Sequence, residues 1–159
     1  MSDPPPNPAE FVAPSPEELA PLFPAYEIEA FIAQGGMGAV YRATQRSLDR
    51  LVAIKILPRE FGEDENFRAS FEAEAKAMAK LNHPNLIGVY DFGDIDGMLF
   101  IVMEFVEGKA LYYSVHEKAI DPLVAFEMVS TISRGLAHAH AGGTIHRDIK
   151  PANILLDLE

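Results

Sequence analysis

Short apolar runs separated by turns dominate the first two thirds of the chain, and they predict a small sheet. Runs rich in β-branched and aromatic residues cover 26–32, 39–44 and 51–57, and glycine-rich or charged turns separate them. This pattern is typical of antiparallel strands. Two further runs, 86–90 and 99–105, predict two more strands with a turn at 94–97.

Helical spacing appears twice in this pattern. Between the third and fourth predicted strands, residues 64–81 predict one helix, and its apolar stripe consists of Phe67, Phe71, Met78 and Leu81. After the fifth strand we expect a short helix at 111–118. A longer helix then has Asp121 as N-cap, Pro122 at its first position and Gly142 after its last turn, and its stripe consists of Val129, Ile132, Leu136 and Ala139. A small sheet with one inserted helix, followed by helices, indicates an α+β fold.

The first 25 residues differ from the rest in composition. Eight of the 12 prolines lie within residues 1–24, so we assign 1–25 as a proline-rich, flexible N-terminal extension. Inside it, Ser15-Pro16-Glu17-Glu18 places a capping hydroxyl three residues before a glutamate, which predicts a short helical turn. An extension docked on the sheet is the open alternative.

Charge and composition exclude several classes of function. The net charge of -11 argues against nucleic acid or an anionic membrane as the main partner. The absence of cysteine excludes disulfides, thiolate zinc sites and cysteine nucleophiles. The most apolar run, 99–106, is short and carries Glu104, so no membrane span is expected in this segment.

Residues 32–40 form a glycine-rich loop between two predicted strands. Gly35, Gly36 and Gly38 let backbone N–H groups approach phosphate oxygens closely. A Walker A loop requires Gly-Lys-Ser/Thr, which is missing here, and a Rossmann turn must lead into a helix. A phosphate lid and a plain hairpin turn without a ligand both remain open.

A lysine and a glutamate form a second candidate pair. Lys55 ends the strand V-A-I-K at 52–55, and Glu74 falls between Phe71 and Met78 on the predicted buried stripe of the next helix. A buried carboxylate without a partner costs several kcal/mol, so we expect Glu74 to pair with a cation, and Lys55 on the preceding strand is the nearest candidate. Two unrelated surface charges are the alternative.

Taken with H-R-D-I-K-P-A-N at 146–153, these motifs resemble a bacterial eukaryotic-like (Hanks-type) Ser/Thr protein kinase. The resemblance covers about residues 26–159 and also includes G-G-M-G-A-V-Y at 35–41 and N-H-P-N at 82–85. It implies a kinase-like N-lobe at about 26–103, a small antiparallel β-sheet with one helix. A hinge at about 104–108 and the first helices and catalytic loop of a C-lobe at 109–159 would follow.

The resemblance also implies roles for individual residues. Glu74 would hold Lys55 against the α- and β-phosphates of ATP. Asp148 would orient the substrate hydroxyl, Lys150 would neutralise charge on the γ-phosphate, and Asn153 would bind Mg²⁺. Glu104 and Val106 would bond the adenine edge through their backbone. Met103 would lie behind the adenine pocket, and the residues expected to sandwich the ring are Ile32, Val40, Ala53 and Leu155.

The implied partners are ATP, Mg²⁺ and proteins with Ser or Thr hydroxyls, in the cytoplasm, although the parent protein could be membrane-anchored. The sequence departs from the family pattern in two places. Ala33 replaces the first loop glycine, and the printed residues end before an Asp-Phe-Gly. We therefore expect a truncated kinase fold with little activity of its own. A non-catalytic ATP-binding or interaction module is the alternative function. The sequence carries no indication of an oligomeric state.

Overall fold

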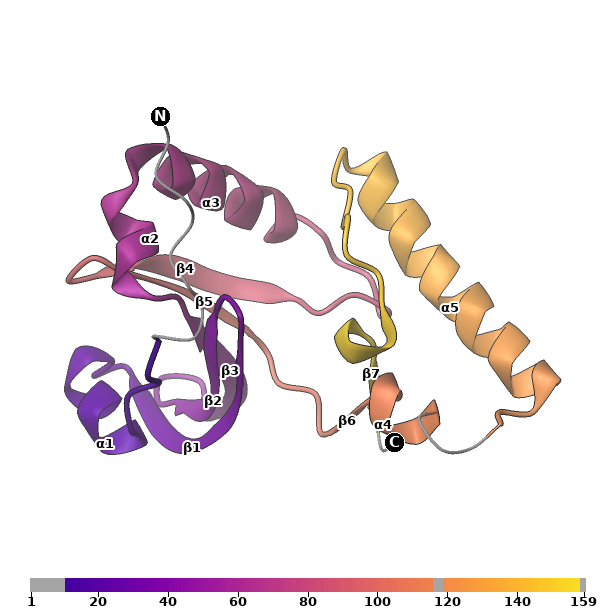
Figure 1. Ribbon diagram of the computed structural model, residues 1–159, viewed down its shortest axis with the longest axis horizontal. Coiled ribbons are helices and arrows are strands. Elements are labelled where there is room, and N and C mark those ends of the chain that lie inside the picture. Colours follow the sequence, from indigo (N-terminus) through magenta and orange to yellow (C-terminus); the bar gives the residue numbers. More distant parts are fainter. Residues whose placement is uncertain (1–10, 116–118, 158–159) are drawn as a thin grey trace. The chain divides into compact units, whose positions relative to one another are not determined.

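The computed structural model describes residues 11–115 and 119–157 (Figure 1). The chain divides into two compact units, and each is described by itself. The first comprises Met1–Ala79 with Val89–Phe105, and the second comprises Lys80–Gly88 with Val106–Glu159.

The first unit is built on a five-stranded antiparallel sheet. Its strand order is β1-β2-β3-β5-β4, so that neighbours in sequence are mostly neighbours in space. The strands are β1 (Tyr26–Gly35), β2 (Gly38–Gln45), β3 (Arg50–Ile56), β4 (Val89–Ile95) and β5 (Met98–Glu104). The five predicted strands are confirmed, but the fourth begins at Val89 rather than at 86.

Residues opposite one another in the register lie on the same face of this sheet, and successive residues of a strand lie on opposite faces. The register therefore assigns each residue to one of two faces. Tyr41, Ile54 and Val102 are opposite one another and are fully buried on the first face. The next row, Val40, Lys55 and Ile101, lies on the second face.

The N-terminal segment, residues 11–25, covers the first face. It contains α1 (Pro16–Leu19) and the 3-10 helix η1 (Ala20–Leu22), and Ser15 forms the predicted capping box with Glu18. Leu19 and Phe23 are only 1% and 2% exposed and belong to the main core cluster. For residues 11–25 the structure thus shows the docked alternative instead of a flexible linker, because these apolar side chains complete the core.

Helices cover the second face. These are α2 (Arg59–Glu63), which the sequence did not predict, and α3 (Glu65–Met78), whose N-cap Asp64 accepts hydrogen bonds from the Asn66 and Phe67 N–H groups. A smaller cluster made by Leu57, Phe71 and Leu99 packs α3 on the sheet.

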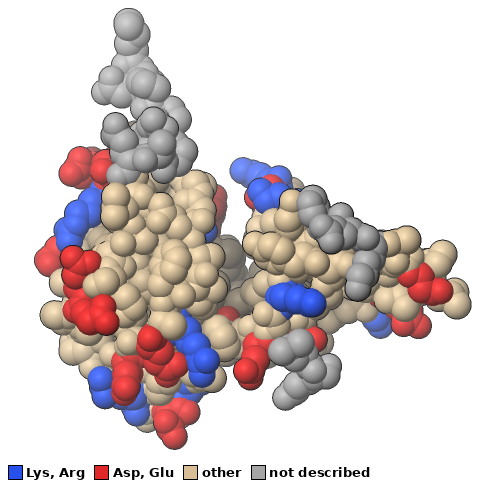
Figure 2. All heavy atoms as spheres, turned by 60° about the horizontal axis from the view of Figure 1, so that its bottom comes forward, with Lys and Arg blue, Asp and Glu red and all other residues tan. Residues whose placement is uncertain are grey.

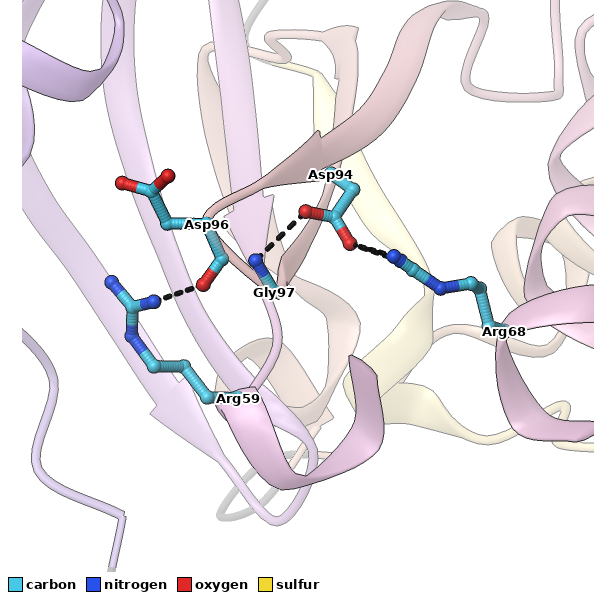
Figure 3. A network of polar contacts seen from close by, with 5 residues as sticks. All are labelled: Arg59, Arg68, Asp94, Asp96 and Gly97. Atoms are coloured by element: carbon cyan, nitrogen blue, oxygen red, sulfur yellow. Dashed lines mark hydrogen bonds and ion pairs between the residues drawn. The ribbon is translucent and has the colours of Figure 1, made fainter. Parts of the chain in front are cut away.

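A polar network ties both helices to the turn between β4 and β5 (Figure 3). Arg68 of α3 pairs with the Asp94 carboxylate, and Arg59 of α2 donates to the Asp96 carbonyl. Asp94 also accepts a 2.8 Å hydrogen bond from the Gly97 N–H, so one carboxylate closes the turn and anchors α3.

The second unit holds two helices and a two-stranded ribbon. Its elements are β6 (Gly108–Ala110), α4 (Leu111–Val115), α5 (Pro122–Ala141), the 3-10 helix η2 (Pro151–Asn153) and β7 (Leu155–Asp157), which pairs with β6. Asp121 caps α5 as predicted.

The predicted apolar stripe of α5 is only partly correct. Val129 is exposed, whereas Gly135 and Ala139 are buried. A Cβ at position 135 would lie 2.9 Å from the Asn85 carbonyl oxygen, so the Asn85 backbone approaches α5 closely at a glycine. Residues 116–118 of the predicted short helix lie outside the described residues.

These elements confirm the α+β prediction. Among the described residues, no helix has both the length and the apolar character needed to cross a membrane. On the face shown in Figure 2, the described Lys and Arg side chains are scattered among Asp and Glu.

Candidate functional site

The glycine-rich loop is the tight turn of the β1–β2 hairpin, with Gly35 directly opposite Gly38. Gly38 has φ +125°, and a Cβ there would lie 1.9 Å from the Ile56 carbonyl oxygen. The fold therefore requires glycine at 38. A Cβ on Gly35 would meet nothing within 4 Å, so packing does not explain that glycine.

The residues expected around the nucleotide share the second face of the sheet. Val40 is opposite Lys55, and two positions along β3, on the same face, Ala53 is opposite Met103. These four side chains therefore lie on the face that also carries α3. Ile32, on β1, is exposed.

A pocket of about 380 Å³ opens on this face beside α3. Lys55 and Glu74 both line it, from the sheet and from the helix respectively. The other lining residues are Met37, Leu57, Phe67, Ser70, Phe71, Met78 and Ile101. The expected adenine residues Ile32, Val40, Ala53 and Met103 are not part of this lining.

The expected ion pair between Glu74 and Lys55 is not formed in this structure. No ion pair or hydrogen bond involves either side chain among the described residues. Glu74 is exposed, whereas Phe71 and Ala75 are the buried residues of α3. The expectation of a buried carboxylate was wrong because Glu74 lies at the edge of the helix stripe, where water solvates it.

Lys55 is the more deeply placed of the two groups. Burial lowers the pKa of its ammonium below the ordinary value, because desolvation disfavours the charged form. A half-buried lysine that faces a pocket without a polar partner among the described residues is well suited to receive an anion.

The remaining predicted nucleotide contacts lie at and beyond the end of β5. Glu104 is the last residue of β5 and belongs to the first unit, whereas Val106 and Leu155 belong to the second. Leu155 begins β7, where it pairs with Ala110, and it is exposed.

In the second unit, the loop that follows α5 brings together the two predicted catalytic residues, Asp148 and Lys150, and the predicted magnesium ligand, Asn153. Lys150 Nζ lies 3.0 Å from Asp148 Oδ2. Asn153 Nδ2 donates to the same Oδ2 and to the Asp148 carbonyl oxygen, both at 2.9 Å. The exposed Asp148 carboxylate is therefore contacted by one cation and one amide.

Local backbone geometry produces this arrangement. Arg147 adopts φ 65°, which is rare for a residue other than glycine, and the Asp148 N–H donates to His146 Nδ1 at 3.2 Å. After Lys150, η2 turns the chain back, and the Asn153 N–H donates to the Lys150 carbonyl at 2.9 Å. The positive φ at Arg147 was not predictable from the sequence pattern.

These contacts favour the ionised form of Asp148. The hydrogen bond from Lys150, then that from Asn153, lowers the pKa of the Asp148 carboxyl below its ordinary value. Both contacts favour the charged form of a side chain that is itself in water.

Sequence reasoning missed two contributors to the first unit's site. Met37, at the tip of the hairpin, lines the pocket. Arg68, through Asp94, fixes the helix that carries Glu74. The only sequence signal for the contact of Arg68 with Asp94 is an arginine on the predicted helix and aspartates in the predicted turn at 94–97.

Comparisons with known proteins identify the family of the chain. Residues 26–159 match the sequence profile of the protein kinase domain. The serine/threonine-protein kinase pkn3 of Myxococcus xanthus is 46% identical over 134 residues, which cover 83% of this chain and 24% of that protein. PrkC of Bacillus subtilis is 43% identical over 133 residues, covering 83% and 20%.

A solved structure shows the same fold. The crystal structure of the Mycobacterium tuberculosis PknI kinase domain superposes with a TM-score of 0.78 at 28% identity, covering 85% of this chain and 55% of that one. This likeness confirms the expected kinase-like fold. The chain spans about a fifth to a quarter of the two curated relatives. The chain belongs to the protein kinase family.

Proposed function

We propose that the protein containing these residues is an ATP-dependent kinase that transfers the γ-phosphoryl group of Mg-ATP to Ser or Thr hydroxyls of proteins. The observation that carries this proposal is the loop in which Lys150 and Asn153 both contact the Asp148 carboxylate. Phosphoryl transfer requires alignment and charge neutralisation more than covalent chemistry, and this loop supplies both.

Asp148 is proposed to accept and orient the proton of the substrate hydroxyl. As an exposed carboxylate it is ionised at neutral pH and can accept a hydrogen bond, and the contacts of Lys150 and Asn153 lower its pKa further. Lys150 is close enough to share a phosphate oxygen placed beside that hydroxyl. Its ammonium would neutralise charge that develops there.

The donor set of this loop fits Mg²⁺, which prefers oxygen ligands. Asn153 uses its Nδ2 for Asp148, which leaves the Oδ1 oxygen of its amide as a possible ligand. We propose Asn153 as one magnesium ligand. When bound, the ion would neutralise charge on the phosphates of ATP.

In the first unit, we propose that Lys55 holds the α- and β-phosphates and that Gly35, Gly36 and Gly38 bring backbone N–H groups to them. A Cβ on Gly35 would meet nothing within 4 Å, so packing within the chain does not require glycine there. Close approach of a phosphate to the backbone would explain this glycine. Glu74 lines the same pocket as Lys55 and is proposed to pair with it when a nucleotide is bound.

The adenine ring is proposed to lie against the face that carries Val40, Ala53 and Met103. Their shared side of the sheet supports this placement. The backbone of Glu104 would bond the adenine edge, and Ile32 of β1 would pack against the ring. Because ATP is a cytoplasmic metabolite, we propose that the reaction takes place there.

Transfer of radiolabelled phosphate from ATP to a generic protein substrate tests the proposal. The assay uses the protein encoded by the complete reading frame that contains these residues. Magnesium-dependent labelling of Ser or Thr is expected, and Asp148→Asn should reduce it by about a hundredfold or more. The matched control Asp157→Asn changes an acid outside the loop. Equal labelling by Asp148→Asn and the unmodified protein, or ATP binding without transfer, would contradict it.

A further inference from the structure

The N-terminal segment reaches the hairpin that carries the glycine loop. The Gln34 side chain donates from Nε2 to the Phe11 carbonyl oxygen at 2.7 Å. Gln34 immediately precedes Gly35, so this contact holds the chain where the turn begins.

A second contact joins the same segment to the other strand of the hairpin. The hydroxyl of Tyr41, a fully buried residue on β2, donates to the Pro14 carbonyl oxygen at 2.6 Å. Tyr41 also makes an edge-on ring contact with Phe31 of β1, with 5.7 Å between centroids. Both strands of the hairpin are therefore fastened to residues 11–14.

These contacts lie behind the hairpin and leave its nucleotide face free. Gln34 is opposite Ala39, a fully buried residue of the core cluster on the first face of the sheet. Val40, the next residue, faces the other way, toward Lys55. The N-terminal segment can thus stiffen the hairpin without occupying the space in front of it.

The segment is itself firmly anchored at its other end. Leu19 and Phe23 are buried, and the Phe23 ring packs edge-on against Phe100 of β5 with 5.1 Å between centroids. The Arg46 N–H donates to the Ala25 carbonyl at 3.0 Å. A contact to residue 11 is therefore a contact to a fixed support.

We propose that the N-terminal segment is a clasp for the glycine hairpin and that Gln34 is a positioning residue for nucleotide binding. The clasp restricts the motion of the hairpin before a nucleotide binds. The hairpin then loses less conformational entropy when its N–H groups bind phosphate. The nucleotide part of this inference rests on the proposed function, whereas the stiffening of the hairpin does not.

Hydrogen exchange of the 159-residue chain without nucleotide tests the clasp directly. Gln34→Met keeps the side-chain length but removes the donor, and it should speed exchange of the amides in residues 35–40 about fivefold. Gln34→Lys restores a donor and should return the rate toward that of the unmodified chain. The control Arg46→Met removes an exposed ion pair with Glu27 at the far end of the same strands. It should leave these amides unchanged.

Titration with Mg-ATP supplies the second arm. Gln34→Met should raise the Kd about threefold or more at unchanged thermal stability, and Gln34→Lys should recover it. Unchanged exchange in Gln34→Met, or equal acceleration in Arg46→Met, would overturn the clasp. Faster exchange with an unchanged Kd would overturn the role of Gln34 in nucleotide binding. Absence of Mg-ATP binding by the unmodified chain would overturn the proposed function, while the exchange result would still decide on the clasp.

Discussion

Asp148 is fully exposed in its loop, and two side chains from the same loop, Lys150 and Asn153, contact its carboxylate. Because Lys150 and Asn153 lower its pKa, their contacts stabilise the loop above the ordinary pKa of an aspartate. This stabilisation is lost as the pH falls through the lowered value. The loop is therefore preformed at neutral pH and acid-sensitive.

We predict that Lys150→Met raises the pKa of Asp148 more than Asn153→Ala does, because the lysine makes the larger contribution. Carboxyl chemical shifts followed by NMR through an acid titration measure both changes. Lys109→Met removes the same charge from β6 and should leave the Asp148 titration unchanged. A normal aspartate pKa in the unmodified chain would contradict the loop geometry.

Lys55 is the opposite case to Asp148, because burial of its ammonium destabilises the folded chain instead of stabilising it. Its lowered pKa means that the folded chain binds this proton less well than the unfolded chain does. The cost is fully present below the lowered pKa and diminishes as the pH rises toward the ordinary lysine value.

We predict that Lys55→Met raises the thermal unfolding midpoint at pH 7, even though it removes a proposed phosphate ligand. The gain should shrink at alkaline pH, as followed by circular dichroism melts at several pH values. Lys76→Met, whose side chain is 63% exposed, is the matched control and should change the midpoint little. A lower midpoint for Lys55→Met at pH 7 would show that the ammonium has a stabilising partner.

Single residues also show where sequence reasoning ended. Asp148, Lys150 and Asn153 were predictable because their contacts are local and span only five residues. The exposure of Glu74 was not, since it depends on which residues of α3 pack on the sheet, and the buried ones are Phe71 and Ala75. Contacts between residues distant in sequence, such as that of Arg68 with Asp94, also hold α3 in place.

At the scale of elements, the β1–β2 hairpin offers a clean comparison between two glycines. Gly38→Ala should destabilise the chain by at least about 2 kcal/mol, because its Cβ would collide with the Ile56 carbonyl at a positive φ. Gly35→Ala meets nothing within 4 Å and should change the free energy of unfolding by less than about 1 kcal/mol. Urea unfolding measures both, and equal losses would contradict the hairpin geometry.

The N-terminal segment makes a second prediction about an element. Leu19→Ala should lower the free energy of unfolding by about 2–5 kcal/mol, because Leu19 is 1% exposed in the main core. Val12→Ala, at a residue that is 84% exposed, should change it by less than about 0.5 kcal/mol. A similar small effect of both substitutions in urea unfolding would mean that the segment does not complete the core.

Elements with strong local signals were predictable, and those that rest on distant partners were not. The capping box at Ser15 and the N-cap at Asp121 involve only residues that are close in sequence. The ribbon of β6 and β7 consists of two three-residue strands far apart in sequence. These strands form only because they pair with each other, and neither segment has a local sequence pattern that predicts a strand.

At the scale of the whole chain, the proposed chemistry is divided between two units. Lys55 and the glycine hairpin belong to the first, and Asp148 with Lys150 and Asn153 belongs to the second. Within the first unit, Lys55 lines a pocket, and within the second, the Asp148 carboxylate lies beside a cation and an amide, which are the groups that the proposed phosphoryl transfer would use.

Calorimetric titration of the 159-residue chain with ATP, with and without Mg²⁺, tests the central claim most directly. We predict saturable binding that requires Mg²⁺ and that Lys55→Met weakens at least about tenfold, since a charge-assisted contact to phosphate is lost. Lys76→Met should bind like the unmodified chain. Absence of binding by a folded chain, or equal binding by Lys55→Met, would contradict the nucleotide site.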